Sequence, residues 1–270
     1  MKIRARAKIN LYLHITGRRE DAYHEIESLL VPVGLADDIE IIPSDKISLE
    51  VSGQFASAAG VDDNIVLKAA NLLAKERHDL GAHIRLVKNI PTGAGLGGGS
   101  ADAAAVLRGL NEIWGMGYSL DELAKLGLKL GADVPFCVYD RPAVVSGIGE
   151  VIKPVNDLPD LPVLLVNPNI SLPTKDVFNK YKEITSVFSD KGFDVNRYIS
   201  GHNDLESAAI SICPAIKDVL NVLQKQKNVV FSRMSGSGAT CFAVFESQKD
   251  KDMACLNISK NYNNWFSCVA

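Results

Sequence analysis

An alternating pattern of apolar and polar residues opens the chain and predicts a β-strand over residues 3–15. One face of this strand is apolar and carries Ile9, Leu11, Leu13 and Ile15. The opposite face carries Lys8, Asn10, Tyr12 and His14. Lys8 and Asn10 would lie about 6.6 Å apart on a pleated strand, so an ammonium and an amide could address one ligand. The alternative is an exposed polar face, because alternation alone is equally typical of a strand with one side in water.

Apolar spacing along the rest of the chain changes between strand and helix periods. Strands are predicted at 39–42, 47–51, 82–87, 161–166, 241–245 and 265–269, with a hairpin over 142–155. Helices are predicted to begin after the capping residues Asp63 and Thr174, and to cover 204–212, 214–226 and 249–261. A Pro- and Asp-rich piece over 153–162 predicts a boundary between two lobes near residue 155.

A glycine-rich stretch, Pro91–Asp102, separates the strand predicted at 82–87 from a helix with an apolar stripe. Five glycines fall within seven residues, and glycine lets the backbone approach an anion and turn its N–H groups toward it. The following helix adds unpaired N–H groups and the positive end of its dipole. The order strand, glycine loop, helix predicts a phosphate site. The alternative, a flexible connector, need not lead directly into a helix.

Two better-known glycine motifs do not fit this stretch. A P-loop requires a lysine before its Ser or Thr, and Gly99 stands at that position. A dinucleotide-binding loop requires an acidic residue about 20 positions further on, at the end of a second strand. Glu112 has a comparable spacing but falls inside a helical run. The loop is therefore predicted to hold phosphate without a lysine of its own.

Further side chains suited to binding or catalysis lie elsewhere in the chain. Tyr23 and His24 could stack on a base and bond to its edge, although neighbours on a strand point to opposite faces, which favours half-buried packing residues. Asp133 is an isolated carboxylate before a Val-Pro pair, which on local sequence favours a helix N-cap. A second glycine stretch, 231–240, could complete an anion pocket or form an ordinary turn.

Composition excludes several classes of partner. The 270 residues are 47% hydrophobic and 23% charged, with no apolar run of about 18 residues and no signal-peptide pattern. We therefore expect a cytoplasmic protein without a membrane partner. A net charge of −3 without any basic cluster argues against nucleic acid. The chain has five cysteines, Cys137, Cys213, Cys241, Cys255 and Cys268. Their wide spacing predicts that they are reduced residues of the core.

Three motifs in a fixed order resemble those of the galactokinase, homoserine, mevalonate and phosphomevalonate (GHMP) kinase superfamily. They are Ala7-Lys8-Ile9-Asn10-Leu11, Pro91 to Ala104, and Met234 to Thr240. Ala22-Tyr23-His24-Glu25 and Gly131-Ala132-Asp133-Val134-Pro135-Phe136 are similar to the branch that phosphorylates cytidine diphosphate-linked methylerythritol. Ala22 stands where that branch usually has Gly, which could stiffen the turn before Tyr23. The resemblance spans nearly the whole chain.

The resemblance implies an α+β, two-lobed GHMP kinase fold. Its N-terminal lobe would be similar to the second domain of ribosomal protein S5, and its C-terminal lobe would be ferredoxin-like. Residues 1–155 would form the ATP-binding and catalytic lobe, and residues 156–270 would complete the substrate cleft, with the last strand a candidate to return to the first lobe. The cofactors implied are ATP and Mg²⁺, with one hydroxyl, Ser100, where other branches have two. We expect a monomer or a weak homodimer.

The resemblance also implies roles for individual residues. Lys8 and Asp133 match the family's catalytic lysine and aspartate, with Asp133 taking or orienting the hydroxyl proton and Lys8 stabilising the transferred phosphoryl. Asn64 and Lys88 would lie near the adenosine of ATP. The phosphates would lie on Pro91, Thr92, Gly93, Ala94, Gly95, Leu96, Gly97, Gly98, Gly99, Ser100 and Ala101. The acceptor would contact Asn10, Thr174, Tyr23, His24 and Phe178, the last three around its cytosine.

The function implied is ATP-dependent phosphorylation of the 2-hydroxyl of the methylerythritol unit, giving a 2-phosphate and ADP in the non-mevalonate route to isoprenoid precursors. One alternative is another small-alcohol kinase, of homoserine or mevalonate type. A second alternative is a nucleotide-binding sensor that has lost catalysis. The presence of both Lys8 and Asp133 favours an enzyme over a sensor.

Overall fold

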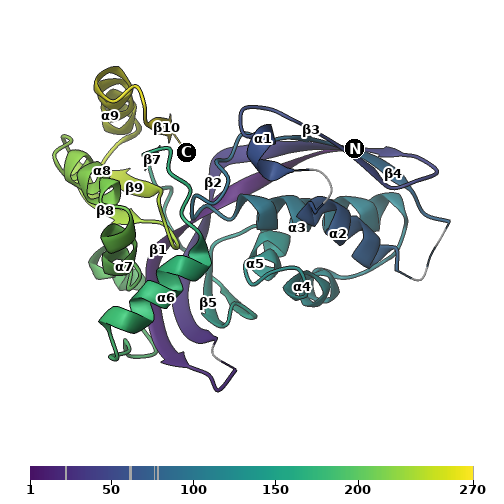
Figure 1. The fold of residues 1–270 in the computed structure, drawn as a ribbon, viewed down its shortest axis with the longest axis horizontal. Coiled ribbons are helices and arrows are strands. Elements are labelled where there is room, and N and C mark those ends of the chain that lie inside the picture. Colours follow the sequence, from purple (N-terminus) through teal and green to yellow (C-terminus); the bar gives the residue numbers. More distant parts are fainter. Residues whose placement is uncertain (22, 61–62, 76, 78, 270) are drawn as a thin grey trace.

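The computed structural model describes residues 1–21, 23–60, 63–75, 77 and 79–269, and in this part of the chain two sheets carry the helices (Figure 1). The strands are β1 (Lys2–Arg18), β2 (His24–Pro43), β3 (Ser48–Ser52), β4 (Ala82–Val87), β5 (Ala143–Gly147), β6 (Val151–Pro154), β7 (Val163–Asn167), β8 (Val229–Met234), β9 (Cys241–Phe245) and β10 (Phe266–Val269). The helices are α1 (Ala56–Ala59), α2 (Ile65–Leu73), α3 (Gly98–Ile113), α4 (Leu120–Leu128), α5 (Val134–Tyr139), α6 (Thr174–Ile184), a 3₁₀ helix (Val195–Ser200), α7 (Glu206–Ile212), α8 (Ala215–Gln224) and α9 (Gln248–Asn261). Ala22, with the stiffened turn expected there, lies outside the described residues.

The larger sheet has the order β3-β4-β2-β5-β6, with β1 pairing with β2, and the smaller has the order β10-β7-β9-β8. Among the described strands every pairing is antiparallel except the one between β3 and β4. Helices and strands are thus mixed without a repeating βαβ order, which confirms the α+β, two-lobed fold. The last strand, β10, pairs with β7 in the smaller sheet. The lobe boundary at residue 155 stays a prediction, and it falls between β6 and β7, which belong to different sheets.

The β1–β2 hairpin runs the length of the larger sheet, and bulges interrupt its alternation. Register shifts occur between Arg6 and Lys8, between Asn10 and Tyr12, and between Ile15 and Gly17. Because each bulge changes which side chains share a face, Tyr12 packs in the same cluster as Ile9 and Leu11, while Leu13 and Ile15 enter a different one. The single apolar face predicted for this strand is therefore correct for Ile9 and Leu11 and wrong from Tyr12 onward. The exposed-face alternative is also wrong, since Lys8, Asn10, Tyr12 and His14 are all buried.

Helix α3 packs its alanine-rich side and its apolar stripe against the larger sheet and α2 (Figure 1). The stripe predicted from the sequence is buried at Val106, Leu107 and Leu110. In α2 the predicted cap is wrong by one residue: Asn64, and not Asp63, is the N-cap, with its side chain accepting from Val66 N. Asn64 has an extended backbone at this position, and Asn and Asp are equally good caps, so sequence alone could not decide between them.

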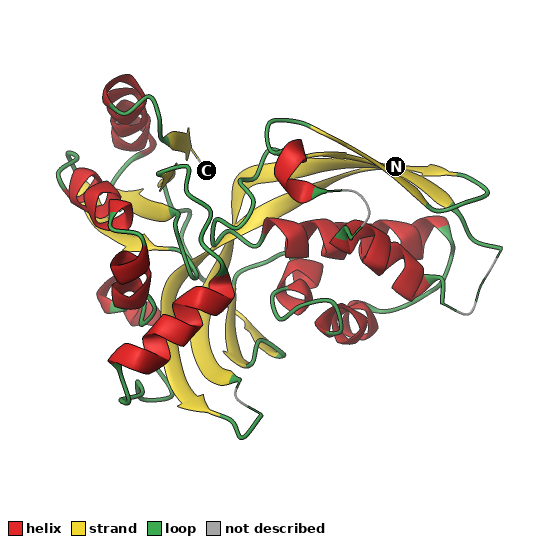
Figure 2. Cartoon of the chain, in the orientation of Figure 1, coloured by secondary structure: helices red, strands yellow, loops and turns green. Residues whose placement is uncertain are grey.

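The core of the molecule continues from one sheet to the other through β1. Ala7, Ile9 and Leu11 of β1 form a buried cluster with Leu165 of β7 and Phe242 of β9. Figure 2 shows α8 and α9 beside the smaller sheet, and they pack on the face of that sheet opposite to the one covered by Ile9 and Leu11 of β1. β1 is therefore fixed by apolar contacts on both sides, and its polar residues are held where the two sheets meet.

The predictions that the cysteines are reduced core residues and that no helix spans a membrane can be compared with the structure. Cys137, Cys213 and Cys241 are free and buried, as predicted, while Cys255 and Cys268 are free but only half-buried. Burial raises the pKa of Cys137, which does not favour a reactive thiolate. Among the described helices none has the length and apolar character needed to cross a bilayer.

Candidate functional site

A cavity of about 1000 Å³ lies where β1, the glycine loop, α6 and the second glycine stretch meet. The glycine loop enters it from β4, and α6 borders it from the C-terminal part of the chain. Every residue that the sequence analysis assigned to catalysis or binding lines this cavity, except Ala101, which is buried on α3. The fold thus brings together residues that are up to 170 positions apart, from Lys8 to Phe178.

The glycine loop has a shape that only glycine adopts easily. Gly93, Gly95 and Gly97 have φ of 64°, 77° and 66°, in the left-handed region. α3 begins at Gly98, and in the described structure no side chain caps it. Since Gly97 and Gly98 line the cavity, the first N–H groups of α3 are available to an anion bound there.

The second glycine stretch lies directly against the first. Ser235 Oγ donates to the carbonyl oxygen of Gly95 at 3.0 Å, and Thr240 N donates to that of Ala94 at 3.2 Å. A β-carbon on Gly95 would lie only 2.2 Å from the carbonyl oxygen of Ser235. The two loops therefore form one continuous wall of the cavity, and their contact depends on glycine at position 95.

The ammonium of Lys8 is buried at the centre of this wall, with 4% of the residue exposed. Its Nζ donates to Asn10 Oδ1 at 2.8 Å and to the Gly95 carbonyl oxygen at 3.2 Å, and lies 3.5 Å from Asp133 Oδ2. Asn10 Nδ2 donates in turn to Ser28 Oγ at 2.8 Å. Asn10 is thus oriented by two partners, and Lys8 is held toward the carboxylate.

Asp133 stands at the N-cap position of α5, but its side chain makes no cap hydrogen bond. Its φ of −84° and ψ of −15° are helical, whereas a capping side chain normally sits on an extended backbone. The side chain is 40% exposed and is paired with Lys8. Asp133 thus occupies the N-cap position that local sequence favours, but its side chain does not cap the helix, and the carboxylate is available to a ligand in the cavity.

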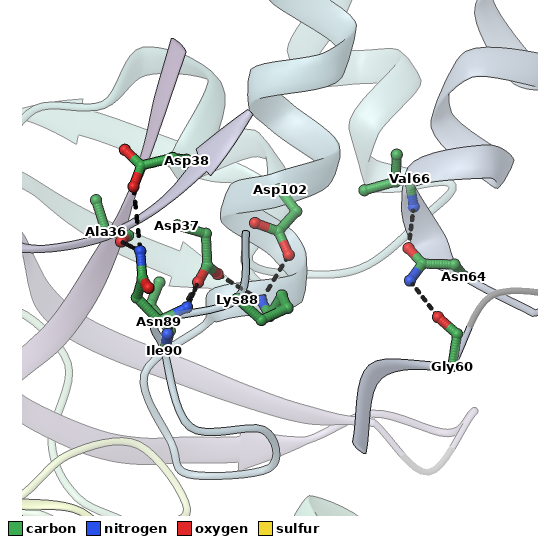
Figure 3. Close-up of polar contacts among 10 residues, drawn as sticks. All are labelled: Ala36, Asp37, Asp38, Gly60, Asn64, Val66, Lys88, Asn89, Ile90 and Asp102. Carbon is green, nitrogen blue, oxygen red and sulfur yellow. Dashed lines mark hydrogen bonds and ion pairs between the residues drawn. The ribbon is translucent and has the colours of Figure 1, made fainter. Parts of the chain in front are cut away.

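Lys88 lies in a buried ionic network at the base of the glycine loop (Figure 3). Its Nζ donates to Asp37 and, at 2.7 Å, to Asp102 Oδ2. Asp37 Oδ1 also accepts from the backbone N of Asn89 at 2.5 Å and of Ile90 at 2.8 Å. Because Asp37 is on β2 and Asp102 on α3, the network ties both ends of the loop to the larger sheet.

Two carboxylates and one ammonium leave this network with one excess negative charge when all three ionise. Burial raises the pKa of Asp102 to about 8, with Lys88 opposing the shift and Asp37 adding to it. For Lys88, burial lowers the pKa, but Asp102 and Asp37 outweigh it and raise the value. Asp37 accepts three hydrogen bonds, whereas Asp102 Oδ1 has no partner among the described residues. Asp102 therefore holds the proton near neutral pH.

The opposite end of the cavity is aromatic. The ring of His24 is buried against Phe178, with centroids 5.1 Å apart, while Tyr23 is 62% exposed at the rim. Burial and two neighbouring cations lower the pKa of His24, which favours the neutral imidazole. The prediction of two half-buried packing residues is wrong, because the strand begins at His24 and leaves Tyr23 in the preceding turn.

The start of α6 meets the second glycine stretch. Thr174 was predicted as the helix cap, but Pro173 takes that position and Thr174 is the first helical residue. Its hydroxyl lies 2.9 Å from Ser237 Oγ instead. Pro173 fixes an extended backbone before the helix, so the Thr174 hydroxyl turns toward the cavity and not toward the helix N–H groups.

Sequence reasoning missed several residues of this site because none belongs to a recognisable motif. Asn203 Nδ2 donates to two carbonyl oxygens of the second glycine stretch, at 2.9 Å and 2.8 Å. Ser28 orients Asn10, Asp37 anchors the glycine loop, and Lys175 and Lys182 line the cavity from α6. For α6 alone a signal was present, since residues 174, 178 and 182 recur at helical spacing on one face.

The comparisons with known proteins define the class as that of the GHMP kinases. Residues 64–141 match the model described as GHMP kinases N terminal domain, and residues 193–264 match GHMP kinases C terminal. A homoserine kinase from Cytophaga hutchinsonii has the same fold, with a TM-score of 0.73 at 19% identity over 100% of this chain and 93% of that one.

Closer relatives narrow the class to one family. A 4-diphosphocytidyl-2-C-methyl-D-erythritol kinase from Paramagnetospirillum magneticum is 40% identical over 99% of this chain and 97% of its own. One from Ruegeria pomeroyi is 43% identical over 90% and 88%. The crystal structure of a 4-(cytidine 5'-diphospho)-2C-methyl-D-erythritol kinase matches with a TM-score of 0.81 and 31% identity, over 99% of this chain and 98% of that one. The chain belongs to the family of 4-diphosphocytidyl-2-C-methyl-D-erythritol kinases.

The contact between the glycine loops predicts opposite effects at two glycines. Gly95→Ala should destabilise the fold by about 1–3 kcal/mol, because its β-carbon overlaps the Ser235 carbonyl oxygen. Gly99→Ala, on α3 and with its nearest neighbour atom at 3.7 Å, should leave stability equal or higher. Urea unfolding of the two variants and the parent checks this. An unchanged midpoint for Gly95→Ala would contradict the tight contact.

The ionic network predicts a pH dependence of stability. The folded-state pKa of Asp102 is raised to about 8, so between pH 4 and pH 8 the native state holds a proton that the unfolded state has lost. Its stabilising contribution is complete below the unfolded pKa and falls as pH rises toward 8, by at most about 1.4 kcal/mol per pH unit. Asp102→Asn should flatten this slope in urea unfolding at pH 5.5, 7 and 8.5. Parallel curves for parent and variant would show that Asp102 is ionised throughout.

Proposed function

We propose that the chain transfers the γ-phosphoryl group of ATP to the 2-hydroxyl of 4-diphosphocytidyl-2-C-methyl-D-erythritol, giving the 2-phosphate and ADP. The observation that carries the proposal is the Lys8–Asp133 pair, which lies in one cavity with a glycine loop and with a ring pair, His24 and Phe178. The family relationship supports the same reaction. In this proposal the reaction belongs to the non-mevalonate route to isoprenoid precursors.

The donor end of the cavity binds ATP in this proposal. The backbone of Pro91–Ser100 and the uncapped start of α3 receive the phosphates, since both present N–H groups and the helix adds the positive end of its dipole. Asn64 and Lys88 line the same region and are proposed to border the adenosine. Lys88 also stabilises the position of the glycine loop through its ion pairs with Asp37 and Asp102.

Mg²⁺ is the proposed companion of ATP. It prefers oxygen ligands and commonly takes only one or two from the protein besides the phosphates. Ser100 and Asp133 offer a hydroxyl and a carboxylate in the cavity, so the residues present fit the ion. When bound, Mg²⁺ neutralises phosphate charge.

Lys8 and Asp133 act on the reacting atoms. Asp133 accepts or orients the proton of the 2-hydroxyl, so that its oxygen attacks the γ-phosphorus as the bond to the β-phosphate oxygen breaks and ADP leaves. Lys8 lies 3.5 Å from Asp133 and stabilises the negative charge that spreads over the transferred group. Asn10 holds the ammonium in place and is proposed to contact the acceptor.

The acceptor end binds the cytidine. A cytosine ring placed beside Phe178 and the exposed Tyr23 can stack, and the neutral imidazole of His24 can accept or donate one hydrogen bond to its edge. Thr174 contacts the acceptor between the rings and Lys8. Residues 1–155 are proposed to form the lobe that binds ATP and carries the catalytic residues, and residues 156–270 the lobe that completes the cleft. The protein is proposed to be cytoplasmic and to be a monomer or a weak homodimer.

The acceptor assay tests this function. Purified protein with ATP and Mg²⁺ should form ADP with 4-diphosphocytidyl-2-C-methyl-D-erythritol, and should form none above background with homoserine or mevalonate. A coupled assay measures ADP formation with each acceptor, and mass spectrometry identifies the phosphorylated product. Turnover of homoserine or mevalonate alone would assign another branch of the superfamily, and no turnover of any acceptor would favour a nucleotide-binding sensor.

The catalytic pair is tested by substitution. Asp133→Asn and Lys8→Met should each lower kcat by on the order of 100-fold or more, because one removes the proton acceptor and the other the charge beside the transferred group. Asp176→Asn is the matched control, since this α6 carboxylate is exposed and does not line the cavity. Steady-state kinetics, with circular dichroism to verify folding, decide the result. Activity within a few-fold of the parent in either variant would overturn the assignment.

A further inference from the structure

The charged residues that line the cavity are nearly all neutralised by a neighbour. Lys8 is paired with Asp133, and Lys88 with Asp37 and Asp102. The remaining carboxylates of the lining are also paired, Asp21 with Arg19 and Asp63 with Lys68. These pairs leave the donor half of the cavity without an unpaired charge from a described side chain.

Lys175 and Lys182 are the exceptions. Both line the cavity from α6, and neither forms an ion pair with any described residue. Both are exposed, so they retain their solvation and their freedom to move toward a ligand. Among the described residues of the lining, two positive charges are therefore unpaired, and both lie on the helix that faces the acceptor.

The geometry of α6 places these charges on either side of the proposed cytosine site. Thr174, Phe178 and Lys182 follow one another at intervals of four residues on one face of the helix, and Lys175 lies beside Thr174. Along the axis Lys175 and Lys182 are separated by about 10 Å, with Phe178 between them. Long lysine side chains lean toward the helix N-terminus, which brings the ammonium of Lys182 back toward the ring.

The surroundings of His24 give an independent sign of where Lys182 lies. Burial lowers the pKa of His24 first, and the positive charges of Lys182 and Arg18 lower it further. Lys182 is thus close enough to act on the imidazole electrostatically. The face of α6 that borders His24 is positive, and Asp21, the described lining carboxylate nearest to His24 in the sequence, is paired with Arg19.

We infer that Lys175 forms the subsite for the diphosphate of the acceptor, and that Lys182, one turn beyond Phe178, adds its positive charge to the attraction from the other side of the cytosine. Together they determine the preference of the site for a nucleoside diphosphate over an uncharged nucleoside. The inference rests on the proposed function, which supplies a diphosphate between the cytidine and the reacting alcohol. The reacting alcohol lies at Lys8, and the cytosine lies at Phe178, so the linking phosphates lie along the first turns of α6. Lys175 and Lys182 act on binding alone, since Lys8 and Asp133 perform the transfer.

Binding of a ligand series tests this inference directly. Isothermal titration calorimetry with cytidine, cytidine monophosphate and cytidine diphosphate, in the presence of saturating ADP to occupy the donor end, measures what each phosphate adds. The parent should bind the diphosphate more tightly than cytidine, by about tenfold or more. In a Lys175→Gln/Lys182→Gln variant most of that difference should disappear, while affinity for cytidine stays the same. The single variants divide the effect between the two lysines.

Lys180→Gln is the matched control. Lys180 is on the same helix and has the same charge, but it pairs with Glu183 at 2.9 Å and does not line the cavity. This variant should keep the full difference between cytidine and its diphosphate. In kinetics the double variant should raise KM for the acceptor without changing kcat or KM for ATP, and the rise should shrink in high salt because screening weakens the parent's attraction.

Three results would overturn the inference, and they are distinguishable. If the double variant retains the parent's preference for the diphosphate, the phosphates bind elsewhere and the proposed function is unaffected. If the parent binds neither cytidine nor its diphosphate, the proposed acceptor is wrong and the inference fails with it. An equal loss in the Lys180→Gln control would mean that overall charge, and not the cavity lysines, produces the effect.

Discussion

The buried ammonium of Lys8 is the point on which the rest of the site depends. It comes from β1, and it bonds to Asn10, to the carbonyl oxygen of Gly95 and to Asp133, which lie on three different segments. A buried cation needs such partners, because leaving it without them in the interior would cost several kcal/mol. The glycine loop and the start of α5 are therefore drawn to one place by the need to satisfy a single charge. β1 can supply that charge because apolar contacts fix it against both sheets.

A second buried cation, Lys88, holds chain segments together at the donor end, but here two carboxylates surround one ammonium. Lys88 is surrounded by two carboxylates, and the excess negative charge is removed by a proton on Asp102. The arrangement keeps the base of the phosphate loop close to neutral. A fully ionised network would add a negative charge beneath a loop whose proposed ligand is itself highly anionic, and repulsion would weaken binding. The proton on Asp102 is thus compatible with the loop's function and with the fold.

The sequence predicted those parts of the site whose structure depends only on residues close together in the chain. The glycine loop follows from backbone freedom, and α3 follows from its apolar stripe, so the loop conformation and the helix after it were predicted correctly, while phosphate binding by the loop stays a prediction. The predicted roles of Asp133 and Thr174 as caps failed because each side chain has a better partner far along the chain, Lys8 and Ser237. The bulge at Asn10 could not be predicted either, since it depends on the pairing with β2. Long-range partners, and not propensities, decide these positions.

The same reasoning explains why α6 carried so little signal in the sequence. Residues that bind a phosphate through backbone groups need glycine, and this requirement leaves a recognisable motif in the sequence. Kinases named for homoserine and mevalonate share the fold of this chain at 13–19% identity. Residues that distinguish one acceptor from another have no such geometric requirement. A lysine can reach an anion from many positions of a helix, because its side chain is long and flexible. We therefore expect acceptor preference in this fold to lie in side chains outside the glycine motifs, and in this chain the unpaired lysines of α6 meet that description.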